Sequence, residues 1–82
     1  MRNIHDNVDQ AQLQQAAQGF ILNARTDGPK LHKAGCDSVG AMHPGAYPKT
    51  FFEKYGEAVN FLDKKYGLHG WVRCGVCNPY SD

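Results

Sequence analysis

The chain has 82 residues, enough for one domain and too few for a second hydrophobic core. Nine Lys and Arg residues against eight Asp and Glu residues leave a formal net charge of +1, and this near balance argues against a strongly basic nucleic-acid-binding module. No stretch approaches the roughly 20 apolar residues of a membrane span, and residues 1–19 lack the apolar segment of a secretory signal. We therefore expect a monomeric, cytoplasmic protein without a membrane partner.

The N-terminal segment differs in composition from the rest of the chain. Residues 7–18 are rich in Gln and Ala, and Asp9 with Gln12 fits the capping box of a helix N-terminus. The apolar stripe of this helix is thin, so we expect weak packing. The sequence predicts a helix or linker over residues 1–19 and the domain proper over residues 20–82.

The next segments alternate between strand-forming and turn-forming sequences. Residues 20–25 are β-formers with rough alternation, and the turn T-D-G-P at 26–29 follows, so residues 20–32 are predicted to form a hairpin. Residues 37–48 contain several turn-formers and are predicted to be a loop. The sequence K-T-F-F at 49–52 is a candidate short strand.

One helix is clearly indicated in the second half of the chain. Side chains recur at the spacing of a single helical face at Tyr55, Ala58, Val59, Leu62 and Tyr66. Lysines lie in its last turn, and Gly67 follows, as is typical of a helix C-terminus. Residues 70–77 are predicted to enter as a strand and then turn back. These elements predict an α+β fold with a short antiparallel sheet and one main amphipathic helix.

Four ligand-type residues form two pairs that lie far apart in the sequence. Three residues separate His32 from Cys36, and two separate Cys74 from Cys77. Gly75 allows the tight turn that aims both thiolates of the second pair at one ion. One imidazole with three thiolates is a common closed zinc site, and these soft ligands favour Zn²⁺ over Mg²⁺ or Ca²⁺. A hydrophobic core this small needs an additional cross-link for stability, so the sequence predicts a structural Zn²⁺ at these four residues.

Two alternatives to this ligand set stay open. Cys74 and Cys77 could form a redox pair, with Cys36 buried in the core and His32 exposed, although the small core would then lack a staple. The fourth ligand could also come from another histidine, namely His5, His43 or His69.

The order of these features resembles a known family. An apolar strand ends in an Arg-Thr-x-Gly turn at 25–28, and the three-spaced ligand pair, an aromatic strand and an E-A helix follow. An aromatic-x-x-Cys-x-x-Cys-x-Pro sequence at 71–79 closes the series. Residues 20–36 and 49–79 are thereby similar to the amino-terminal zinc domain of the Ada family, the bacterial methylphosphotriester repair factors. The resemblance implies the fold of that domain.

The resemblance also bears on activity. In the Ada domain four cysteines bind zinc, and the first of the three-spaced pair accepts a methyl group from a DNA phosphotriester. A zinc-bound thiolate stays deprotonated and nucleophilic, whereas a ligating imidazole is no comparable methyl acceptor. His32 stands at that position here. The resemblance therefore implies a relative that is not an enzyme and has no catalytic residue.

The same resemblance implies binding to a phosphate backbone, of DNA in preference to RNA. The implied contacts are basic and polar residues near the metal: Arg25, Thr26, Lys30, Lys33 and Arg73. These residues could equally be ordinary solvated surface charges. Aromatic side chains could stack on bases, although such residues are more often core: Tyr47, Phe51, Phe52 and Trp71. We expect Trp71, close to the second ligand pair, to cover the metal.

Two other functions remain possible. The zinc could stabilise a purely structural or protein-interaction module, with residues 37–48 or 1–19 contacting a protein partner. A methyl-accepting repair protein is the second alternative, which the imidazole at position 32 disfavours.

Overall fold

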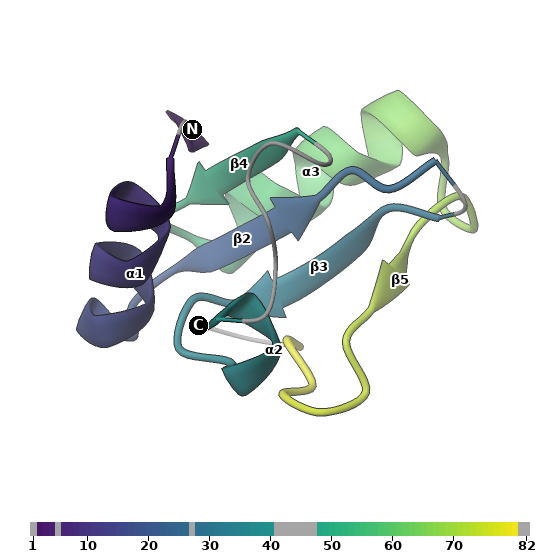
Figure 1. The fold of residues 1–82 in the computed structure, drawn as a ribbon. Coiled ribbons are helices and arrows are strands. Elements are labelled where there is room, and N and C mark those ends of the chain that lie inside the picture. The colour runs from purple at the N-terminus through teal and green to yellow at the C-terminus, as the bar shows by residue number, and fades with distance from the viewer. Residues whose placement is uncertain (1, 5, 27, 41–47, 81–82) are drawn as a thin grey trace.

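Five strands and three helices make up the part of the chain that the computed structural model describes, which is residues 2–4, 6–26, 28–40 and 48–80. In chain order the elements are β1 (Arg2–Ile4), α1 (Asn7–Ala16), β2 (Phe20–Asn23), β3 (Lys30–Lys33), α2 (Asp37–Gly40), β4 (Lys49–Phe52), α3 (Tyr55–Tyr66) and β5 (Val72–Arg73). The strands form one sheet in the order β1-β4-β2-β3-β5, and Figure 1 shows α3 running behind it. The predicted α+β fold class is confirmed.

The hairpin and the aromatic strand lie at the centre of the sheet. Strands β2 and β3 are antiparallel, with Phe20 opposite Lys33 and Asn23 opposite Lys30. Strand β4 pairs with β2 on its other side, also antiparallel. The sheet departs from the predicted antiparallel pattern at one edge, because β5 lies parallel to β3. This follows from chain direction: β3 and β4 are both antiparallel to β2 and therefore run the same way. Helix α3 then carries the chain back across the sheet, so β5 begins in that same direction.

Helix α3 packs on one face of the sheet through the predicted side chains. Ala58 and Leu62 are fully buried, and the other three residues of the predicted face are partly buried against the same cluster. Gly67 ends the helix with a φ of 85°, a left-handed conformation that favours glycine. The α3 cluster consists of Phe20, Leu22, Leu31, Phe52, Ala58, Leu62 and Trp71.

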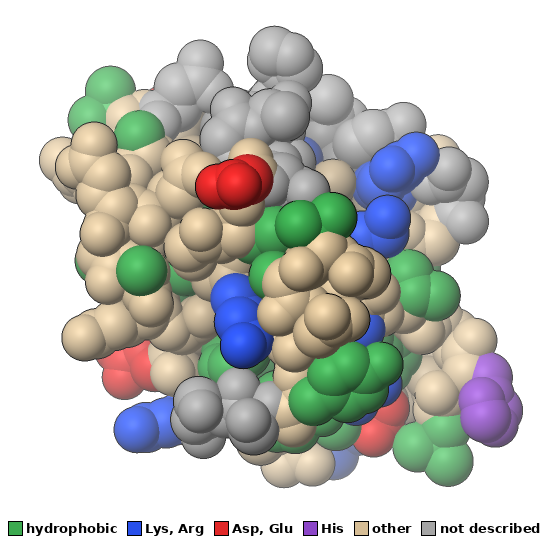
Figure 2. Space-filling model, turned by 90° about the horizontal axis from the view of Figure 1, so that it is seen from below, with side chains coloured by type: hydrophobic (Ala, Val, Ile, Leu, Met, Phe, Trp, Pro, Cys, Tyr) green, Lys and Arg blue, Asp and Glu red, His purple; other side chains and the backbone are tan. Residues whose placement is uncertain are grey.

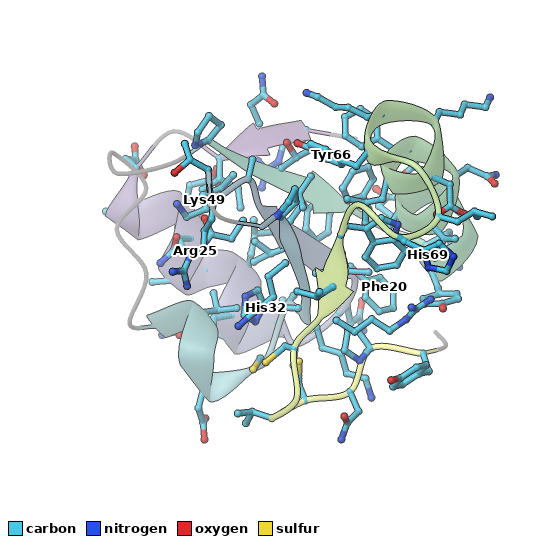
Figure 3. All side chains as sticks on the ribbon, turned by 90° about the vertical axis from the view of Figure 1, so that its right-hand side faces the viewer. Phe20, Arg25, His32, Lys49, Tyr66 and His69 are labelled. Carbon is cyan, nitrogen blue, oxygen red and sulfur yellow. The ribbon has the colours of Figure 1, made fainter. Side chains whose placement is uncertain are left out.

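A second cluster lies on the opposite face of the sheet, on the side of α1 and α2. Figure 3 shows His32, Arg25 and Lys49 on this side, and Phe20 and Tyr66 on the side of α3. This division follows from the alternation of side chains along each strand. The metal-side cluster consists of Ile4, Ile21, Ala34, Cys36, Val39 and Cys74.

The predicted N-terminal helix is present as α1, but its cap differs from the prediction. The carboxylate of Asp6, not that of Asp9, accepts the N-terminal hydrogen bond, from the Asp9 N–H at 2.8 Å. The helix reaches the metal side through polar contacts: the Gln10 Nε2 donates to the Val39 carbonyl oxygen at 2.7 Å, and the Gln14 Nε2 to that of Cys36 at 3.1 Å. These bonds tie α1 to the segment that carries Cys36.

The sequence did not indicate β1. Its three residues pair with β4, with Arg2 opposite Phe51 and Ile4 opposite Lys49, and Ile4 is buried. Residues 1–19 thus contribute an edge strand to the sheet in addition to the helix. Within the predicted loop 37–48, the first four residues form the short helix α2, and residues 41–47, which include Tyr47, lie outside the described residues.

The surface combines scattered charges with a few exposed hydrophobic side chains. Seen from below, Lys and Arg side chains occupy several separate places, with hydrophobic side chains between them and fewer acidic ones (Figure 2). The large hydrophobic residues that are exposed are Val8, Leu68, Val72, Val76 and Tyr80. In the described part of the chain, no helix has the length and apolar character needed to cross a membrane.

Candidate metal centre

The backbone positions the two ligand pairs at the end of one strand pair. His32 lies in β3, and Cys36 follows through a tight turn in which its N–H donates to the Lys33 carbonyl oxygen at 3.0 Å. Cys74 follows β5, and its N–H donates to the Leu31 carbonyl oxygen at 2.9 Å. Since this bond extends the β3–β5 pairing by one residue, Cys74 is held beside His32 by sheet geometry.

The four predicted ligands come together. The ligand atoms of His32, Cys36, Cys74 and Cys77 all lie within 4.8 Å of one another. A tetrahedral zinc site with Zn–S bonds of about 2.3 Å places its sulfur atoms about 3.8 Å apart. The Sγ atoms of Cys36 and Cys74 are 3.9 Å apart, which matches that edge. The cluster has the size of a four-coordinate metal site.

Backbone N–H groups around the cluster point at sulfur. The Lys33 N–H donates to the Cys77 Sγ at 3.2 Å, and the Val76 N–H to the Cys74 Sγ at 3.4 Å. The second of these closes the turn of the Cys-x-x-Cys motif. Such bonds stabilise thiolate over thiol and orient the sulfur lone pairs, as outer-shell partners of metal sites do.

The imidazole of His32 has the properties of a ligand. Its residue is 4% exposed, and its buried Nδ1 has no hydrogen-bond partner among the described residues. Burial, with a smaller contribution from the charge of Lys30, lowers the pKa of His32 from 6.5 to about 4. The ring is therefore neutral at pH 7, which is the form that binds metals. A buried, unpaired imidazole nitrogen beside three thiols fits a bound cation.

The pKa values of the Cys74 and Cys77 thiols are shifted in opposite directions. Burial raises the pKa of Cys77 to about 12, and the adjoining thiols of Cys36 and Cys74 add to this rise against the N–H of Lys33. Burial also acts to raise the pKa of Cys74, but the N–H groups of Cys77 and Val76, together with hydrogen bonds to the thiols of Cys36 and Cys77, bring that pKa below its usual value. Crowded thiols resist ionising together, whereas a divalent cation removes their repulsion.

Two alternatives to this ligand set were a Cys74–Cys77 redox pair and a different histidine as the fourth ligand. All three cysteines are free, and Cys36 is buried within the cluster instead of packing elsewhere in the core. His69 is exposed in the turn after α3, on the side of the sheet away from His32 (Figure 3). His5 and His43 lie outside the described residues.

The prediction that Trp71 covers the metal is wrong. Trp71 belongs to the α3 cluster, and its indole Nε1 donates to the Asp63 carboxylate at 2.9 Å. Three positions separate Trp71 from Cys74, and an odd separation along an extended chain places two side chains on opposite faces. The indole therefore stabilises the helix side of the sheet. Phe52 is fully buried there too, whereas Phe51 is partly buried on the metal side.

Four of the five predicted phosphate contacts lie along the β2–β3 hairpin, and the fifth, Arg73, lies in β5. Arg25 and Thr26 are exposed after β2, Lys30 is partly exposed at the start of β3, and Lys33 is exposed at its end. Arg73 is half-buried in β5, next to Leu31 of β3.

The guanidinium of Arg73 is held between aromatic rings. It lies 4.5 Å from the ring centroid of Trp71 and 4.9 Å from that of Tyr80, and its NH2 group donates to the Tyr55 hydroxyl at 2.7 Å. This stack fastens the C-terminal segment to α3. Sequence reasoning missed the stack, because Tyr55 lies 18 residues from Arg73 in the chain and no local pattern links the two.

Fold and site together define a small α+β domain with a His/Cys₃ cluster that could hold a metal ion. Comparison with known protein families, with curated proteins and with solved structures finds no match to this chain. The case for function rests on the residues themselves.

Proposed function

We propose that this chain is a non-catalytic structural zinc module that binds nucleic acid, DNA in preference to RNA, through its backbone phosphates. The observation that carries the zinc assignment is the convergence of one imidazole and three thiols within 4.8 Å. This donor set suits Zn²⁺, and four protein ligands leave no open position for a substrate or an activated water. Stabilisation of a small core is then the role of the metal.

Nucleic-acid binding draws its support from the resemblance to the Ada domain and from the hairpin that carries His32. Arg25, Thr26 and Lys33 are exposed on this hairpin or at its turn, where a phosphate backbone has access. Lys and Arg side chains are scattered on the face seen in Figure 2, so binding should be weak and steeply dependent on salt. Arg73 serves mainly to position the C-terminal segment, because its guanidinium is stacked between rings.

Native mass spectrometry and gel shifts test the two parts of the proposal separately. One zinc per chain, lost on treatment with a chelator, would support the metal assignment. Labelled DNA and RNA duplexes and single strands are then titrated at about 50 mM and about 200 mM salt, where three phosphate contacts predict a loss of affinity on the order of 50-fold. Absence of any shift at the lower salt would reject nucleic-acid binding. A stoichiometric methyl adduct on a cysteine after incubation with methylated DNA would reject the non-catalytic assignment.

A protein-interaction module is the second candidate, favoured by one observation. Val72, Val76 and Tyr80 are 51%, 71% and 62% exposed, and all three lie in or after the edge strand β5. Exposed apolar side chains beside an unpaired strand edge are typical of surfaces that contact proteins. Salt-insensitive binding of a protein, without a DNA shift, would select this candidate.

A further inference from the structure

A hollow lies between the open end of the β2–β3 hairpin, opposite its turn, and the start of α3. Its volume is about 420 Å³, within the size range of small-ligand pockets. The residues that line it are Ala17, Gln18, Gly19, Phe20, Lys33, Glu53 and Lys54. A second hollow of about 380 Å³ adjoins it and shares four of these residues. None of the lining residues is a metal ligand, so this is a site distinct from the zinc cluster.

The floor of the hollow is fixed by close packing. Gly19 has a φ of +86°, and a Cβ at this position would lie 2.6 Å from the Phe52 carbonyl oxygen. Only glycine fits there without a shift of the backbone. The Phe20 ring beside it packs edge-on against Tyr55, with ring centroids 5.7 Å apart. The hollow is therefore a preformed feature of the fold.

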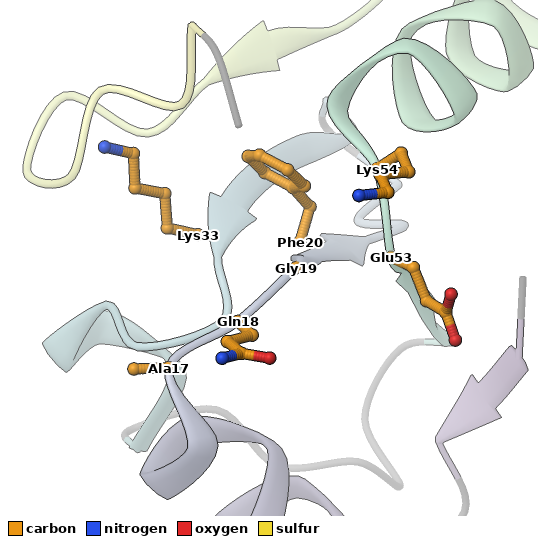
Figure 4. A pocket seen from close by; sticks show the side chains of 7 residues that line it. All are labelled: Ala17, Gln18, Gly19, Phe20, Lys33, Glu53 and Lys54. Atoms are coloured by element: carbon orange, nitrogen blue, oxygen red, sulfur yellow. The ribbon is translucent and has the colours of Figure 1, made fainter.

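Two lysines from separate elements flank this floor. Figure 4 shows the side chains of Lys33, at the end of β3, and Lys54, just before α3, on either side of the Phe20 ring, with the Lys33 ammonium directed away from the ring. Among the described residues, neither ammonium group has a carboxylate partner. The Glu53 carboxylate also lines the hollow but points away from Phe20, beyond Lys54 (Figure 4). Two exposed ammonium groups without a carboxylate partner beside a concave surface raise the positive potential there and attract an anion to it.

We propose that this hollow binds one phosphodiester group of a nucleic-acid backbone, with Lys33 and Lys54 as its cations and the Gln18 amide as a further donor. The inference rests on the proposed function and adds to it a defined phosphate subsite, including Lys54, which the sequence did not single out. The zinc site supports this subsite, because the Lys33 N–H is bonded to the Cys77 Sγ and the metal would hold that backbone in place.

The test compares the zinc-loaded wild type with Lys54→Gln and Lys33→Gln, and with Lys64→Gln as a matched control. Lys64 is an exposed lysine in the last turn of α3, at the other end of that helix. Binding of a labelled DNA duplex is measured between about 50 mM and about 200 mM salt. Lys54→Gln and Lys33→Gln should each reduce the slope of the logarithm of the binding constant against the logarithm of salt concentration by about 0.9. Each should also weaken binding at low salt on the order of tenfold. The control should match the wild type, and amide resonances of Gly19 and Lys54 should shift as DNA is added.

The outcomes separate this inference from the proposed function. If DNA binds but both hollow variants behave as the control, with no shift at Gly19 or Lys54, the subsite is refuted and the proposed function stands. If DNA fails to bind at low salt, the proposed function fails, and titration with inorganic phosphate decides the subsite alone. Saturable shifts at the hollow would then support a site for free phosphate groups, and their absence would overturn it. Zinc content and thermal stability of each variant verify that the fold is intact.

Discussion

Replacement of His32 by Ala is the sharpest test of the ligand set. The imidazole is one of four candidate ligands, and it is buried on the metal side of the sheet. Structural zinc sites contribute about 10–16 kcal/mol of apparent binding free energy at pH 7. An equal share among four ligands assigns about 3 kcal/mol to His32, which corresponds to a zinc dissociation constant about 100-fold larger in the variant.

The same free energy sets the expected loss of thermal stability. For a domain of 82 residues, about 3 kcal/mol lowers the melting temperature by roughly 12–24 °C. Competition with a chromophoric chelator measures the dissociation constant, and circular dichroism measures the melting curve. His69→Ala is the matched control, because this histidine is exposed in a turn and should change neither quantity. Wild-type zinc affinity in His32→Ala, or an equal loss in His69→Ala, would refute the ligand assignment.

Three further predictions concern the protein around the site. For the chelator-treated protein, the free energy of unfolding should decrease as the pH falls from 6.5 to about 4. In this window His32 binds a proton in the unfolded state, where its pKa is 6.5, but not in the folded state, where its pKa is about 4. Urea titrations of His32→Gln should show a weaker decrease. Leu62→Ala should cost about 2–5 kcal/mol by opening a cavity in the α3 cluster, whereas Leu68→Ala, at a residue that is 74% exposed, should change stability by less than about 0.5 kcal/mol in the same assay. Arg73→Lys should cost about 1 kcal/mol by weakening the stack on Trp71, and a change of tryptophan fluorescence should accompany the loss.

Local patterns predicted the elements and the ligands because both depend on short-range geometry. The buried face of α3 follows from a periodicity that Ala58 and Leu62 display directly. The two ligand pairs are also local motifs, each shaped by a tight turn, and one metal needs both. The buried face of α3 and the two ligand pairs could therefore be predicted without knowledge of contacts between distant segments.

The features that were missed depend on contacts between distant segments. Strand β1 has three residues, too few for a periodicity, and it exists through its pairing with β4. Helix α1 has a thin apolar stripe, in which Leu13 packs against the metal-side cluster, and the amides of Gln10 and Gln14 add contacts that a hydrophobicity pattern does not register. The error at Trp71 arose from treating closeness in sequence to Cys74 as closeness in space, although strand alternation separates the two faces.

The two sides of the sheet depend on each other through β5. This strand has only two residues, and such a short edge strand has little stability of its own. Cys74 fastens its end to the ligand cluster on one face, while Trp71 and Arg73 fasten it to α3 on the other. A metal that holds the cysteine therefore also keeps the indole in the apolar core. Loss of the ion would loosen both faces together, which is why one site can stabilise a domain with so small a core.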